Sequence, residues 1–196
     1  MNKKILLFTS LILGCALLLG CNSRTDIEGT YIKVSKDDTV TYFIRESFDK
    51  EYYSVDELKQ MIEEDAITFN SENKAEFIEV KKVQVVDRVT DVEILYHTTE
   101  AFALNNQITF FAGDPTEGGN LGLNLSRVFV NVDDQNDTMN RADLYAMEKV
   151  KILVTNVTEP VVLPGKVLYI AGENVELLNH NTVQNKENET YIAVYK

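Results

Sequence analysis

The stretch SVDELKQMIEEDAITFN, residues 54–70, decides the main helix of the fold. Ser54 and Glu57 have the spacing of a capping box, in which the serine side chain accepts a hydrogen bond at the start of a helix. After it, apolar residues recur at helical spacing, namely Leu58, Met61, Ile62, Ala66 and Phe69. The stretch therefore predicts one amphipathic helix over residues 55–70.

Runs rich in β-branched and aromatic residues surround this helix. They predict strands at 30–36, 39–45, 77–86, 92–97, 108–112, 127–132, 150–154, 167–171, 175–178 and 191–195. Short helices are expected at 98–104 and 142–147, and the apolar phase slips at Lys81-Lys82, which predicts a bulge there. Because strands dominate, the chain is expected to be α+β: a single domain with a mostly antiparallel sheet, one main amphipathic helix and short additional helices.

The first residues indicate export. Leu18-Leu19-Gly20-Cys21 follows two lysines and an apolar stretch from Ile5 to Leu19, which is the layout of a bacterial lipoprotein leader. That apolar stretch is shorter than the roughly 20 residues a membrane-spanning helix needs. In such leaders the cysteine receives a diacylglyceryl group, and often a further acyl chain such as palmitate, and becomes the mature N-terminus. We therefore expect Cys21 to be the site of lipid attachment.

Two alternatives to this cleavage remain open. Gly14-Cys15 has the same form, but cleavage there leaves an apolar mature end, whereas cleavage before Cys21 exposes a polar segment. The other alternative is an ordinary secreted protein in which the cysteine is accidental. The preferred division is a signal peptide at 1–20, a lipidated cysteine and polar tether at 21–29, and one extracytoplasmic domain at 30–196.

The charge of the chain limits its partners. It has 31 acidic and 19 basic residues and a net charge of −12, which becomes −14 if Lys3 and Lys4 leave with residues 1–20. Such a surface is repelled by nucleic acid and by anionic lipid headgroups. We expect no nucleic acid partner, and attachment to the cell membrane through the acyl chains on Cys21 alone. Since Cys15 and Cys21 are the only cysteines, the folded part has no disulfide and no cysteine nucleophile.

Catalytic motifs are weak. His97 and His180 are the only histidines, and neither lies in a nucleophile motif. Residues 47–50 and 71–74 match the S-x-x-K pattern of penicillin-recognising enzymes, but the S-D-N and K-T-G elements that accompany it do not occur. We predict no catalytic residue and favour a protein that is not an enzyme.

Two loops match ligand sites only in part. Residues 113–120 have the glycine spacing of a phosphate loop without its lysine and Ser/Thr, so the glycines are interpreted as supplying positive φ in a surface loop. Residues 133–137 carry clustered carboxylate and amide oxygens, which suit Ca²⁺, without the glycine and glutamate of an EF-hand loop. We interpret them as a solvated acidic turn, predict no metal and no cofactor, and leave Ca²⁺ binding as an open alternative.

Three segments resemble known proteins. Tyr52–Lys59, Pro164–Ile170 and Asn174–Leu178 resemble segments of uncharacterised small lipoproteins of Gram-positive gut bacteria, in order over most of the chain and least from Asp114 to Ala146. The resemblance implies a location on the extracytoplasmic face of a Gram-positive cell membrane and a similar fold. It implies no activity.

Three functions fit these observations. The first is a lipid-anchored, non-catalytic binding or interaction module at the cell surface, whose partner is a protein, a glycan or a small molecule. The second is a small cell-envelope hydrolase acting on wall or glycan polymers through acidic residues or the two histidines. The third is a small-ligand capture protein. A deep pocket with two converging carboxylates would favour the second, and a closed apolar cavity the third. We favour the first.

Overall fold

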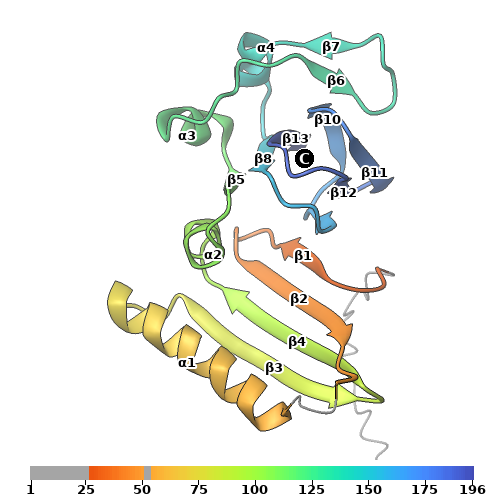
Figure 1. Ribbon diagram of the computed structural model, residues 1–196. Coiled ribbons are helices and arrows are strands. Elements are labelled where there is room, and N and C mark those ends of the chain that lie inside the picture. The colour runs from red at the N-terminus through yellow and green to blue at the C-terminus, as the bar shows by residue number, and fades with distance from the viewer. Residues whose placement is uncertain (1–26, 51–53) are drawn as a thin grey trace, which may run out of the picture.

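The computed structural model describes residues 27–50 and 54–196, and these contain thirteen strands in two mostly antiparallel sheets and four helices (Figure 1). The α+β prediction is confirmed, with two sheets where one was expected. The helices are α1 (Val55–Asn73), α2 (Thr99–Asn106), α3 (Pro115–Asn120) and α4 (Arg141–Ala146).

The seven-stranded sheet contains both long hairpins of the first half of the chain. Its order is β11 (Val175–Asn179), β12 (Thr182–Asn185), β9 (Val161–Val162), β1 (Tyr31–Val34), β2 (Val40–Ser47), β4 (Val89–Tyr96) and β3 (Ile78–Val86). Strand β1 pairs in parallel with β9, so the first and last parts of the chain share this sheet. Neither β9 nor β12 was predicted.

The six-stranded sheet is built from the second half of the chain. Its order is β5 (Phe110–Gly113), β8 (Lys151–Thr155), β13 (Tyr191–Tyr195), β10 (Val167–Ala171), β6 (Phe129–Asn131) and β7 (Thr138–Met139). All five residues of β13 are buried, which agrees with its place between β8 and β10. The predicted strand at the end of the chain is therefore central to this sheet.

Helix α1 begins as predicted and ends three residues later. The Ser54 hydroxyl accepts a hydrogen bond from the Glu57 backbone at 3.3 Å, and the helix ends at Lys74, which adopts a left-handed conformation with φ of 55°. The helix runs alongside β3, and Ile62, Ala66 and Phe69 pack into the core (Figure 1). Met61, expected on this apolar face, is largely exposed.

The β3–β4 hairpin confirms the predicted bulge and corrects the predicted loop. The register shifts between Val80 and Lys82, as the phase slip indicated. The loop expected from Asp87 to residue 91 is a two-residue turn, and β4 already begins at Val89. The turn is short because Asp87 and Arg88 both have positive φ, 51° and 62°, which matches the twist of the two strands.

Replacing Arg88 by glycine is expected to raise the free energy of unfolding by about 0.5 kcal/mol. Left-handed backbone costs a residue with a Cβ atom about 1–2 kcal/mol, and the extra chain entropy of glycine offsets part of that gain. Urea denaturation followed by circular dichroism measures the change. Lys36→Gly is the control, because Lys36 lies in the β1–β2 turn without positive φ and should show no gain. A loss of stability in Arg88→Gly would contradict the expectation.

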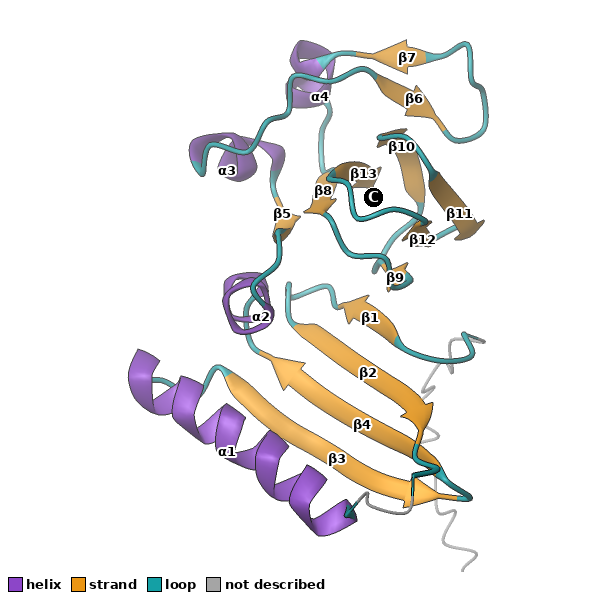
Figure 2. Cartoon of the chain, viewed as in Figure 1, coloured by secondary structure: helices purple, strands orange, loops and turns teal. Residues whose placement is uncertain are grey.

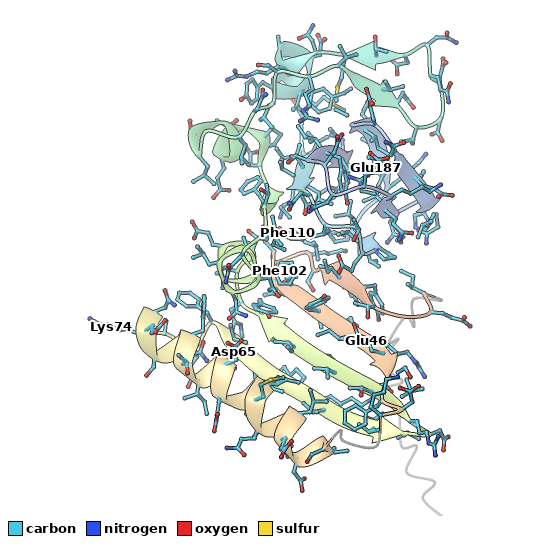
Figure 3. The ribbon with its side chains drawn as sticks, in the orientation of Figure 1. Glu46, Asp65, Lys74, Phe102, Phe110 and Glu187 are labelled. Atoms are coloured by element: carbon cyan, nitrogen blue, oxygen red, sulfur yellow. The ribbon has the colours of Figure 1, made fainter. Side chains whose placement is uncertain are left out.

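Helix α2 connects the two sheets. Its N-cap Thr98 accepts a hydrogen bond from the Ala101 backbone at 3.0 Å, so this helix is capped as predicted. Phe102 packs edge-on against Tyr42 and Tyr96 on one side and against Phe110 on the other, with ring centroids 4.8–5.6 Å apart. Figure 3 shows Phe102 and Phe110 where the lower sheet meets the upper part of the molecule. One hydrophobic core therefore extends from α1 to β13.

Candidate functional site

An open groove of about 890 Å³ lies between β6, the end of β10 and β11. Figure 2 shows the β6–β7 hairpin beside β10, and β10 turning into β11. We call this the β6–β11 groove. Its lining residues are Arg127, Val128, Val130, Asn131, Val132, Gln135, Ile170, Ala171, Gly172, Glu173, Val175, Leu177 and Glu189.

One wall of the groove follows from alternation along a strand. Val130 in β6 and the flanking residues Val128 and Val132 occupy every second position and all line the groove, and Val130 pairs with Ile170 of β10. Val128 is 66% exposed and Val130 is 36% exposed. The other face of the strand carries Phe129, which is fully buried in a second core cluster. This strand is thus apolar on both faces, and one apolar face remains open to solvent.

The opposite wall depends on a close approach at Gly172. A Cβ atom at this position would lie 2.7 Å from the Tyr191 Cβ, so only glycine lets β10 turn directly into β11. The turn brings Val175 and Leu177 to the groove. Strand β11 pairs with β12 and with no other strand in the described ranges, so its second edge is free.

Polar groups hold the frame of the groove in place. The Arg127 guanidinium donates to the Thr190 carbonyl at 2.8 Å. On the outer side of β6, Asp137 accepts from the Tyr169 hydroxyl at 2.8 Å and from the Asn131 amide at 2.7 Å. The hydrogen bond to Asp137 raises the pKa of Tyr169 above its ordinary value. These bonds fix the position of the β6–β7 hairpin relative to β10.

The side chains that line the groove are suited to binding a partner rather than to catalysis. Among its described lining residues there is no histidine, cysteine, serine, threonine or tyrosine, and the acidic ones are Glu173 and Glu189. Both of these are exposed at the rim. Apolar side chains and polar groups line the groove in similar measure, and such a mixture is suited to binding.

The two histidines lie apart from the groove and from each other. His97 follows β4 and lines a separate hollow of about 480 Å³ near the end of α1, together with Glu63, Glu76 and Glu79. His180 is exposed in the turn between β11 and β12. No described hollow brings the two imidazoles together.

The S-x-x-K matches have ordinary structural positions. Ser47 is the last residue of β2, and Lys50 forms an ion pair with Asp49 at 3.9 Å. Ser71 lies in the last turn of α1, and its carbonyl accepts from the Lys74 backbone at 3.3 Å. In the described part of the chain, neither serine hydroxyl is bonded to the lysine of its motif. Cys21, the predicted lipid-attachment residue, lies outside the described residues.

The interpretation of the glycine-rich stretch as a surface loop with positive φ is wrong. Residues 115–120 form α3, capped by the Asp114 side chain, and Gly113, Gly118 and Gly119 all lack positive φ. A Cβ atom on Gly118 would lie 3.1 Å from both Ile152 and Phe111. Gly118 therefore allows the short helix to pack closely on the sheet.

The carboxylates of the acidic turn at 133–137 do not converge on one point. Asp133 pairs with Lys166 at 2.8 Å, and Asp134 accepts from the Asn136 backbone at 3.0 Å. Asp137 bonds Tyr169 and Asn131, as described above. Among the described residues, no three His, Cys, Asp or Glu side chains are placed to hold one metal ion.

The melting temperature is accordingly expected to be the same in millimolar Ca²⁺ and in EDTA. Each carboxylate of this turn already has a protein partner, and a ligand that binds the folded state would have to displace those partners to raise the stability. Thermal unfolding followed by circular dichroism in the two buffers measures this. A higher midpoint in Ca²⁺ would restore the calcium alternative.

A second, smaller hollow of about 290 Å³ lies between α1 and the sheet beneath it. Its walls are mainly aliphatic, with Asp65, Asn105, Asn106 and two tyrosines at the polar positions, and Asn105 donates to Asp65 at 3.3 Å. Burial raises the pKa of Tyr42 to about 12, so its hydroxyl stays protonated at neutral pH. This hollow has one carboxylate, so it does not hold the pair a glycan hydrolase needs.

Sequence reasoning did not find the groove residues. The available signal was the pattern of residues 127–132. Valines occupy every second position, and the alternate positions include the buried Phe129, so that both faces of the strand carry apolar side chains. Among the described residues, no helix has the length and hydropathy to cross a bilayer. Comparisons of the chain with family models, with curated proteins and with solved structures find no match.

Proposed function

We propose that this protein is a non-catalytic binding module on the extracytoplasmic face of a Gram-positive type cell membrane. Acyl chains on Cys21 hold it there, and the β6–β11 groove binds an extended segment of a partner protein. The leader at 18–21 supports the anchor. The observation that carries the binding role is the pair of exposed valines at 128 and 130, beside the half-buried Val132, because exposed apolar surface rimmed by polar residues marks interaction sites.

Several features favour a polypeptide over other ligands. No aromatic side chain lines the groove in the described part of the chain, so a sugar ring has no stacking surface there. The free edge of β11 offers backbone donors and acceptors to an added strand, and the valines offer contacts for its alternate side chains.

The hydrolase alternative receives less support. A glycoside hydrolase needs two carboxyl groups in different environments, one of them in an apolar pocket where it acts as the acid. Glu173 and Glu189 are the acidic residues of the groove, and both are exposed. Release of soluble fragments from isolated cell wall, lost in Glu173→Gln or Glu189→Gln, would favour the hydrolase over the binding module.

Cross-linking on intact cells tests the binding role. A photo-cross-linking amino acid at position 128 is expected to give a discrete adduct with one partner protein, identified by mass spectrometry. The same amino acid at position 104 is the control, since Leu104 is as exposed as Val128, at 65% and 66%, but lies on α2 away from the groove. Equal adducts at both positions, or none at 128, would contradict the proposal.

A charge placed in the groove should prevent this contact. With the cross-linker at position 130, Val128→Asp is expected to lower the adduct yield about tenfold, because a carboxylate must then be desolvated without a partner. Leu104→Asp adds the same charge elsewhere and should leave the yield unchanged. Because both positions are exposed, neither substitution is expected to affect folding.

A further inference from the structure

A hollow of about 300 Å³ on another part of the surface is rich in lysine. It lies where the β1–β2 turn, the segment before β8, the β9–β10 turn and the end of β13 meet, and it shares no residue with the β6–β11 groove. We call it the lysine pocket. Its lining residues are Lys36, Lys149, Lys151, Pro164, Gly165, Tyr195 and Lys196.

The pocket concentrates positive charge in an acidic protein. Four of its seven lining residues are lysines, in a chain whose net charge is −12. Asp38 neutralises Lys151 through contacts of 2.6 and 2.7 Å to the ammonium group. The other three lysines have no ion-pair partner within 4.0 Å in residues 27–50 and 54–196. Neighbouring cations repel one another, and a bound anion relieves that repulsion.

The backbone beneath these lysines is well fixed. Gly165 lies against the Lys196 carbonyl so closely that a Cβ atom would not fit, and Lys166 and Lys196 exchange two backbone hydrogen bonds of 2.9 and 3.0 Å. Lys149 adopts a left-handed conformation with φ of 60°. The lysines therefore project from positions that are already ordered, which reduces the entropy lost on binding.

Tyr195, one of the residues that line the pocket, has a buried hydroxyl group without a hydrogen-bond partner in the described part of the chain. Tyr195 is 2% exposed, and its hydroxyl makes no hydrogen bond within the described part of the chain. Burial, with a smaller contribution from Asp38, raises the pKa of Tyr195, so the hydroxyl remains a donor at neutral pH. Buried polar groups are nearly always bonded, and an unmade bond costs about 1–3 kcal/mol.

We propose that the lysine pocket binds the phosphate group of a small ligand. A phosphate monoester carries a charge of about −1.5 to −2 at neutral pH, which matches several ammonium groups better than a single carboxylate does. The ammonium group of lysine binds phosphate by acting as a point charge. The volume of about 300 Å³ is at the lower end of the range for ligand pockets, which suits a phosphate ester of a small alcohol. Since anionic bilayers repel this acidic surface, a soluble ester is favoured over a lipid headgroup.

Calorimetric titration of the full chain in a nonionic detergent tests the proposal, with glycerol 3-phosphate as the probe at constant ionic strength in chloride. The double variant Lys36→Gln, Lys149→Asn is expected to bind at least about tenfold more weakly, because two charge-assisted contacts are lost. Asparagine is chosen at 149 because it tolerates positive φ. The control Lys59→Gln, Lys186→Gln removes the same charge from lysines outside the pocket and should bind as the parent does.

The remaining results are equally informative. No binding of the probe, or an equal loss in the two double variants, would overturn the proposal. Glycerophosphoglycerol, the deacylated headgroup of a phospholipid, distinguishes the sources: tighter binding of this diester identifies a lipid headgroup, and tighter binding of the monoester identifies a soluble phosphate ester.

Discussion

Replacing Phe102 by alanine is expected to lower the free energy of unfolding by about 3–5 kcal/mol, the cost of removing a buried phenylalanine ring. Phe102 is 1% exposed, and its ring contacts Tyr42, Tyr96 and Phe110 edge-on. The cavity cannot close easily, because these neighbours belong to both sheets and each is fixed by its own strand. Urea denaturation followed by circular dichroism gives the change.

Leu104→Ala on the same helix is the matched control. Leu104 is exposed, so its truncation removes little packing and should change the stability by less than about 0.5 kcal/mol. A loss below about 1 kcal/mol in Phe102→Ala would mean that the core can collapse around the missing ring. In that case α2 would not be the element that holds the two sheets together.

The elements that were predicted correctly have local signals. The side chains of Ser54 and Thr98 cap α1 and α2. Each accepts a hydrogen bond from the backbone N–H of the residue three positions later, and this spacing is visible in the sequence. The bulge after Val80 was visible as a slip in alternation. Each of these features depends on residues within one element or one hairpin, so a single sequence contains the information.

The division into two sheets has no local signal. Strand β9 has two residues, and its parallel pairing aligns Ile32 with Val161, far apart in the chain. Nothing in the composition of Val161-Val162 distinguishes a strand from a buried loop. The lysine pocket has no local signal either, because Lys36, Lys149 and Tyr195 come from distant parts of the chain. Sites assembled from distant turns cannot be found from motif spacing.

The glycine-rich stretch illustrates the opposite error. Gly118 and Gly119 suggested a flexible loop, since glycine is common where φ is positive. In the fold they lie inside α3, where a Cβ atom on Gly118 would lie 3.1 Å from Ile152 and Phe111, and one on Gly119 would meet the Tyr145 hydroxyl. Glycine has two uses, backbone freedom and close packing, and the sequence alone does not separate them.

Replacing Cys21 by alanine is expected to abolish lipid anchoring, so that the protein is released to the medium or left unprocessed. Two acyl chains bind a bilayer stably, at about 0.8 kcal/mol per buried CH₂ group. They are the sole attachment to the membrane that we propose. The acidic surface is repelled by anionic lipids, so charge cannot replace the lost chains. Cell fractionation with immunoblotting should find the variant in the medium, or unprocessed with residues 1–20 still attached.

The second cysteine of the leader makes this experiment specific. Cys15→Ala keeps the basic start, the apolar stretch and the Gly20-Cys21 junction, so it should fractionate with the membrane as the parent does. If Cys15→Ala were released and Cys21→Ala retained, the acylated residue would be Cys15 and the tether would begin with an apolar segment. A Cys21→Ala chain that is cleaved before residue 21 and still sediments with membranes would contradict lipid anchoring, since neither acyl chains nor surface charge would then account for its attachment.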